Sequence, residues 1–94
     1  MRRWTVQDRS GRQIYLTEER WEHILEKHDE LIGRLDDLLD TLRYGQRRQE
    51  TVDPQRYRYR RAYDDMRYGF NHIVTVVVFR YDASGAANNF VLTA

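Results

Sequence analysis

The sequence has no cysteine, a single lysine and no long apolar run. Without cysteine, disulfides, thiolate nucleophiles and cysteine-based zinc sites are excluded. No apolar run approaches the length of a membrane span. The basic start at Met1 to Trp4 is not followed by an apolar stretch, so no secretory signal is expected. We therefore expect a cytoplasmic protein that does not contact a membrane.

Lysine is scarce because nearly all cations are arginine: of the 16 basic residues, only Lys27 is lysine. Arginine binds phosphate through a planar fork, although a GC-rich genome would also favour its codons. The net charge is only +1, but residues 29–40 are acidic, and Arg56–Arg61 holds four arginines and no acid. This separation predicts one basic face. The 94 residues suffice for a single domain, 1–94.

The first part of the chain reads as a β-hairpin followed by two helices. Residues 4–7 and 14–16 alternate apolar and polar side chains around a polar turn. Thr17 is a predicted N-cap for a helix over 18–28. A second helix is predicted from the apolar stripe between Leu31 and Leu42, with Gly45 just past its end.

The remainder reads as strands at 49–52, 56–63, 73–79 and 90–93, joined by short connections. The run at 73–79 is apolar on both faces and is expected to be the central strand. The predicted fold class is therefore α+β: an N-terminal β-hairpin and two helices packed on a four-stranded antiparallel sheet.

The three histidines do not suggest a metal site. His23 and His28 are separated by about 140° of rotation on an ideal helix, and the chain lacks the spacing of zinc hydrolases. From the pattern alone, His28 continues the apolar stripe at a helix end, His23 faces solvent and His72 caps a sheet edge. The acidic helix residues read as a solvated face: Asp36, Asp37 and Asp40. No metal and no other cofactor are expected.

The stretch Arg56–Arg61 alternates arginine and tyrosine, which on a strand places guanidiniums on one face and phenols on the other. Guanidiniums match phosphate geometry and phenols stack on bases, so this face fits RNA. The competing interpretation is a solvated face whose arginines pair with the acidic helix. RNA cleavage without metal needs an acid–base group, a phosphate-binding cation and a hydrogen-bond donor, and His, Arg and Thr93 can supply them.

Four segments resemble the BECR nucleases, a group that includes barnase, EndoU, colicin and RelE. They are Ile14–Ile24 with His28 and Leu31 following, the run Tyr57–Arg61, and the strands Val74–Val78 and Phe90–Ala94. The resemblance covers nearly all of the chain from Ile14. It implies a small metal-independent endoribonuclease of toxin type, cleaving RNA by 2′-OH transesterification and held by an antitoxin protein.

Carried over residue by residue, the resemblance assigns catalysis to a helix histidine, a strand arginine and a last-strand hydroxyl. The catalytic set is His23, His28, Arg60 and Thr93. The substrate-binding set is Arg58, Tyr59 and Arg61. The chain departs from the pattern at Asp29 and Gly45, where the group usually has proline, and the last strand stops at Ala94.

Two other classes of function stay open. One is a non-catalytic RNA- or protein-binding module that uses the same arginine and tyrosine face. The other is a RelE- or ParE-like toxin that inhibits a protein target without cutting RNA. The pattern also leaves a homodimer open.

Overall fold

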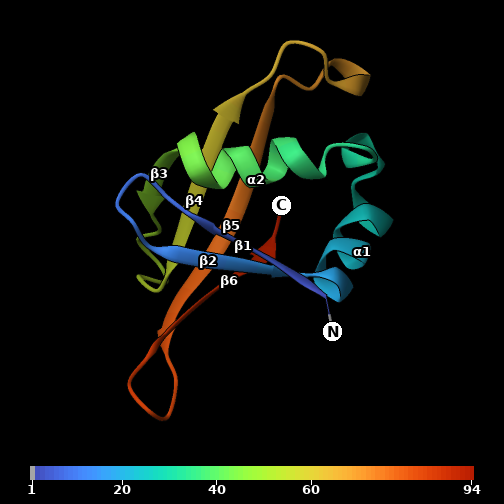
Figure 1. Ribbon diagram of the computed structural model, residues 1–94. Helices are drawn as coiled ribbons and strands as arrows, with labels where there is room; N and C mark the ends of the chain where they lie inside the picture. Colours follow the sequence, from blue (N-terminus) through green and yellow to red (C-terminus); the bar gives the residue numbers. More distant parts are fainter. Residues whose placement is uncertain (1) are drawn as a thin grey trace.

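The computed structural model describes residues 2–94 and has two α-helices and one six-stranded sheet (Figure 1). The strands are β1 (Arg3–Gln7), β2 (Gln13–Thr17), β3 (Gln46–Gln49), β4 (Arg56–Ala62), β5 (His72–Tyr81) and β6 (Ala87–Thr93). The helices are α1 (Glu18–Lys27) and α2 (Leu35–Tyr44), with short 3₁₀ turns η1 (Asp29–Leu31) and η2 (Arg67–Gly69). The α+β class is thus confirmed.

The predicted four-stranded antiparallel sheet is wrong in detail. The strand order is β1-β2-β6-β5-β4-β3, so the N-terminal hairpin belongs to the sheet. It joins through β2 and β6, which run parallel with Tyr15 opposite Phe90, whereas all the other pairs are antiparallel. These two strands lie far apart in the sequence, so no local pattern indicates that they pair.

Local signals account for the helix boundaries. The Thr17 hydroxyl accepts a hydrogen bond from the Arg20 amide at 3.1 Å, and this caps α1 as predicted. The second helix starts later than its apolar stripe, at Leu35, because Gly33 takes a positive φ of 79° that ends the helical path after η1. No helix in residues 2–94 is both long and apolar enough to cross a membrane.

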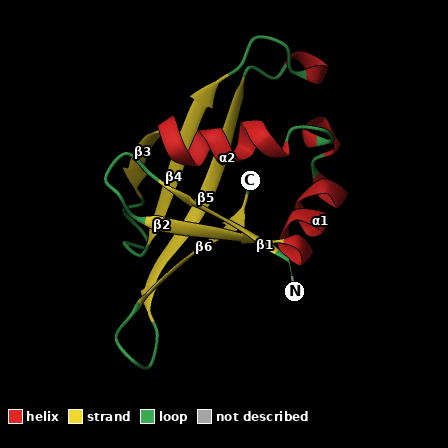
Figure 2. Ribbon diagram, viewed as in Figure 1, coloured by secondary structure: helices red, strands yellow, loops and turns green. Residues whose placement is uncertain are grey.

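Figure 2 shows α2 lying across β4 and β5 and α1 beside the ends of β1 and β2, and buried residues of both helices join one core on the same face of the sheet. The core between them is built from residues of every layer, including Leu16 of β2, Trp21 of α1, Leu38 of α2, Tyr59 of β4 and Val77 of β5. On β4 and β5 the side chains between these core residues point to the other face, which no helix covers. We call this second surface the open face.

Candidate functional site

The open face of β4 carries the arginines of the predicted RNA-binding stretch. Tyr57 and Tyr59 point toward the helices, whereas Arg56, Arg58 and Arg60 alternate with them and point away. The register places Arg58 opposite Val76 and Arg60 opposite Val74. The predicted separation of guanidiniums and phenols on β4 therefore exists.

These arginines do not pair with the acidic helix. Asp37 and Asp40 of α2 accept from Arg34 and Arg43, at 2.8 and 2.9 Å. Arg60 has no carboxylate within ion-pair distance among residues 2–94, whereas Arg58 pairs with Glu50 at 2.9 Å. Arg56 is also paired, with Asp53 at 3.2 Å, so Arg60 is the open-face arginine of β4 most available to an anion.

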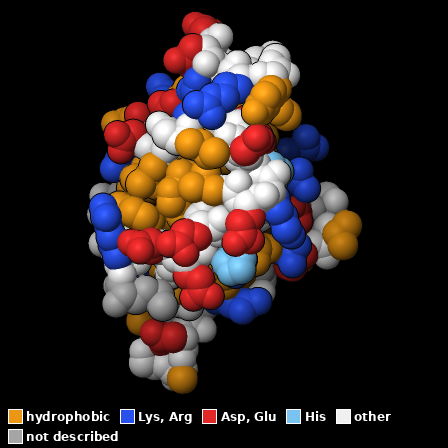
Figure 3. Space-filling model, turned by 90° about the vertical axis from the view of Figure 1, so that its right-hand side faces the viewer, with side chains coloured by type: hydrophobic (Ala, Val, Ile, Leu, Met, Phe, Trp, Pro, Cys, Tyr) orange, Lys and Arg blue, Asp and Glu red, His pale blue; other side chains and the backbone are white. Residues whose placement is uncertain are grey.

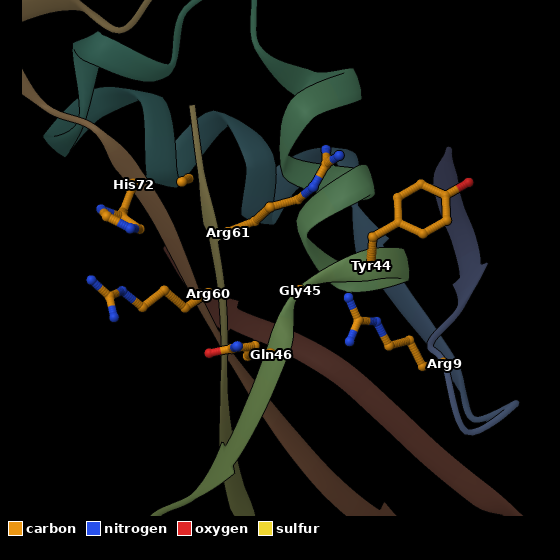
Figure 4. Close-up of a pocket in the computed structure, with 8 residues that line it drawn as sticks. Arg9, Tyr44, Gly45, Gln46, Arg60, Arg61 and His72 are labelled. Atoms are coloured by element: carbon orange, nitrogen blue, oxygen red, sulfur yellow. The ribbon is translucent and has the colours of Figure 1, made fainter. Parts of the chain in front are cut away.

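His72 lies on the same face as Arg60. It opens β5 opposite Ala62, two residues along β4 from Arg60, which puts the two Cα atoms about 8 Å apart by strand geometry. Figure 4 shows both side chains on one side of β4, with Gln46 of β3 below them. A phosphate held by Arg60 would thus lie within reach of the imidazole.

The imidazole of His72 is oriented by its neighbour. Its Nδ1 lies 2.7 Å from Oδ1 of Asn71, an oxygen that can only accept, so the neutral tautomer that forms this hydrogen bond is the one with its proton on Nδ1. Nε2 then has a free lone pair and can act as a base. His72 is half-buried, which holds the ring at the face while leaving it accessible.

Arg60 and His72 line a hollow of about 350 Å³ at the end of the sheet, where β4 extends past β3. Across β4 from Arg60 and His72, three further side chains border it: Arg61, Tyr44 and Arg9 (Figure 4). Arg61 lies over the rings of Tyr44 and Tyr63, with its guanidinium carbon 5.5 and 5.3 Å from their centroids. We call this hollow the arginine groove.

The arginine groove is supported by a buried hydrogen-bond network. Tyr59 is 1% exposed, and its hydroxyl donates to Asp8 at 2.6 Å. Asp8 also accepts the amides of Ser10 and Arg12, so it fixes the turn that carries Arg9. Burial by itself would raise the pKa of Asp8, but these hydrogen bonds and the charge of Arg12 lower it overall. Tyr59 is thus structural and cannot stack on a nucleobase, contrary to its predicted place in the substrate-binding set.

The structure does not bring the predicted helix histidines to this site. His23 is exposed on α1, between Glu19 and Glu26 at 3.9 and 3.8 Å. Helix α1 packs on the core side through Trp21 and Ile24, so His23 and Arg60 lie on opposite sides of the sheet. On the side where α1 lies, acidic side chains surround an exposed histidine (Figure 3).

The other predicted residues divide between structural and surface positions. His28 bonds through Nδ1 to Glu30 at 3.0 Å and so links the end of α1 to η1. Thr93 pairs with Val76 at a β-bulge, in the same cross-strand row as Arg58. By strand geometry the Cα atom of Thr93 lies about 12 Å from that of Arg60 and about 14 Å from that of His72. Thr93 and His72 therefore cannot contact one phosphate group.

The sequence did contain a signal for His72. The nine residues between β4 and β5 suggest a hairpin, which would have paired His72 near Ala62 and next to Arg60. Within residues 2–94, no three His, Asp or Glu side chains are grouped as they would be around a metal ion. Comparisons with protein-family models, curated proteins and solved structures gave no match to this chain.

Proposed function

We propose that this protein is a small metal-independent endoribonuclease of BECR type whose active site is the arginine groove. The observation that carries the proposal is the position of His72 beside Arg60, a cation with no ion-pair partner in residues 2–94, on a face free of helices. Toxin-type action in the cytoplasm, held by an antitoxin protein, is part of the same proposal and rests on the sequence resemblance alone.

Each group has a role that its chemistry permits. Nε2 of His72 takes the proton of the 2′-hydroxyl, and the 2′-oxygen then attacks phosphorus. The P–O5′ bond breaks, the leaving 5′-oxygen takes a proton from solvent, and the products are a 2′,3′-cyclic phosphate and a 5′-hydroxyl. Arg60 stabilises the charge on the phosphate oxygens throughout. Arg58, held by Glu50, contributes a longer-range positive potential.

A second candidate is a non-catalytic RNA-binding module. It is favoured by the distance from His72 to Glu50, the carboxylate that lies beside the open face of β4. The two are about 20 Å apart by strand geometry, so Glu50 cannot serve as a second acid–base group at one phosphodiester. A site with one titratable group is expected to be a slower catalyst than one with an acid and a base.

The test is cleavage of a labelled single-stranded RNA in excess chelator by the wild type and three variants. We expect His72→Ala and Arg60→Ala each to lose at least about 100-fold in rate. His23→Ala is the comparison that decides between the two histidines, and we expect it to cut at the wild-type rate.

Three outcomes would contradict the proposal. RNA that is bound but left intact by the wild type would favour the binding module. Loss of cleavage in His23→Ala together with normal cleavage in His72→Ala would move the active site to α1. Toxicity in cells without any RNA cleavage would indicate a protein target.

A further inference from the structure

A second group of aromatic and cationic side chains lies on the open face, away from the arginine groove. Tyr15 of β2 and Phe90 of β6 are opposite each other, with ring centroids 6.2 Å apart and planes inclined at 41°. Both side chains are half-buried. Together with Thr17, Arg20 and Val91 they line a hollow of about 190 Å³. We call this group the aromatic pair.

Arginines lie over both rings. The guanidinium carbon of Arg3 is 4.6 Å from the centroid of Tyr15, and that of Arg80 is 5.6 Å from the centroid of Phe90. Neither these two nor Arg20 has a carboxylate within ion-pair distance in residues 2–94. A guanidinium whose flat face rests on a ring keeps its N–H edge for an anion. The aromatic pair therefore combines flat apolar surface with unneutralised cations.

The position of the aromatic pair relates it to the arginine groove. Phe90 is opposite Val78, which is opposite Arg56, four residues along β4 from Arg60. By strand geometry the Cα atoms of Phe90 and Arg60 are about 16 Å apart, a distance that a few nucleotides of single-stranded RNA can span. The β5 side chains between them are valines rather than charged residues: Val74 and Val76 are half-buried and Val78 is buried.

We propose that the aromatic pair is a base-stacking subsite, and that the ligand of the open face is single-stranded RNA rather than a duplex. Stacking of bases on aromatic rings stabilises binding by an amount that depends little on sequence, and arginines beside the rings hold the phosphates. A duplex already stacks its bases internally and cannot offer their flat faces to Tyr15 and Phe90. Charge complementarity supports this occupant, because the cations flank the apolar strip on both sides. The proposal rests on the proposed function for the identity of the ligand.

The test is binding of a fluorescent single-stranded 12-mer with 2′-O-methyl riboses, which the protein cannot cleave, followed by anisotropy. We expect the double variant Tyr15→Leu/Phe90→Leu to bind about tenfold more weakly, since stacking on each ring is lost. Tyr81→Leu is the matched control: Tyr81 is 79% exposed near the β5–β6 turn and points away from the open face. It should bind as the wild type does.

A second variant keeps the test valid if the leucine variant folds poorly. Arg3 and Arg80 are exposed, so Arg3→Gln/Arg80→Gln changes charge without altering the core. The slope of log affinity against log salt should become shallower by about 1 to 2. Wild-type affinity for an abasic 12-mer or for duplex RNA equal to that for the single strand would overturn the subsite. So would unchanged binding by both double variants.

The readouts separate this inference from the nuclease proposal. Wild-type protein that binds the 12-mer in a ring-dependent way but never cleaves unmodified RNA would refute the nuclease and support the subsite. Protein that cleaves RNA while the ring variants bind normally would refute only the subsite. Wild-type protein that binds no single-stranded RNA would overturn the subsite directly.

Discussion

The two faces of the sheet are made by the same strands and yet carry opposite kinds of side chain. On β4, Tyr59 is buried beneath the helices, while Arg58 and Arg60 alternate with it on the open face. On β5, Val77 is fully buried against the helices, while Val76 beside it is only half-buried. Successive side chains of a strand point to opposite faces, so one sequence segment specifies both surfaces.

The difference between the faces predicts that folding stability depends on one face and the proposed RNA binding on the other. The helix-covered face removes apolar surface from water, which is the main favourable term in folding. The open face leaves arginines without carboxylate partners in the described part of the chain, at Arg48, Arg60 and Arg80, which contributes little to folding. Substitutions on one face should therefore lower stability, and those on the other should lower RNA affinity.

The largest expected effect comes from the covered face. Leu38 of α2 is fully buried, so Leu38→Ala should lower the free energy of unfolding by about 2–5 kcal/mol. Val76→Ala on the open face should cost clearly less, because Val76 is already half exposed. Urea denaturation of the two variants measures this. Equal losses would mean that the open face is packed as tightly as the core.

The hydrogen bond between Tyr59 and Asp8 is the next test of the covered face. Tyr59→Phe removes a 2.6 Å bond to a buried carboxylate and should cost about 1.5–3 kcal/mol of unfolding free energy at neutral pH. Tyr57→Phe is the matched control, because no hydrogen bond to its hydroxyl is found in residues 2–94. A similar loss in both variants would show that the hydroxyl of Tyr59 is not specifically needed.

Acid should weaken the same network. The pKa of Asp8 in the folded protein is lowered, by Tyr59 and the turn amides against the effect of burial. Asp8 therefore contributes stability that is complete above its unfolded pKa of about 3.9 and is lost as the pH falls through its folded value. Thermal unfolding of the wild type and Asp8→Asn should differ most above pH 4 and converge below it. A difference that grows on acidification would contradict this.

Local patterns predicted those parts of the fold that depend on neighbouring residues. Thr17 caps α1, and β4 alternates as expected, because both features follow from residues close in sequence. The parallel contact of β2 with β6 was missed, because Tyr15 and Phe90 meet only through tertiary packing.

The candidate site was predicted only in part for the same reason. Alternation placed Arg60 among the arginines of one β4 face, but its choice as the catalytic arginine, like the choice of the α1 histidines, came from the resemblance. The short connection between β4 and β5 indicates a hairpin that brings His72 near Ala62, but the exact register depends on the conformation of that loop, which the sequence does not specify. Tyr59 was misassigned because alternation separates two faces without saying which one the helices cover.

The connection between α2 and β3 gives a prediction with a smaller expected effect on stability. Gly45 connects α2 to β3, and a Cβ there would lie 2.9 Å from the carbonyl oxygen of Arg60 and closer still to that of Thr41. Both are backbone atoms that cannot rotate away, so Gly45→Ala should cost about 1–3 kcal/mol. Gly85→Ala is the comparison: a Cβ there meets no neighbour, but the residue has a positive φ of 85°, so its cost reports backbone strain without steric overlap. The melting temperatures decide, and unchanged stability of Gly45→Ala would show that the junction has room to adjust.

The smallest effect on folding, and the most informative one for the open face, is expected for Arg60→Gln. Arg60 is exposed and has no ion-pair partner in residues 2–94, so its loss should change the unfolding free energy by no more than about 0.5 kcal/mol. Its phosphate contact should nevertheless disappear, which makes the dependence of log affinity for single-stranded RNA on log salt shallower by about 1. Arg43→Gln removes the same charge from α2, where Arg43 is paired with Asp40 at 2.9 Å. If binding depends on the open face rather than on net charge, only Arg60→Gln changes this slope. Equal changes in the two variants would mean that RNA affinity depends on the net charge of the whole molecule. The assignment of RNA binding to the open face would then be wrong.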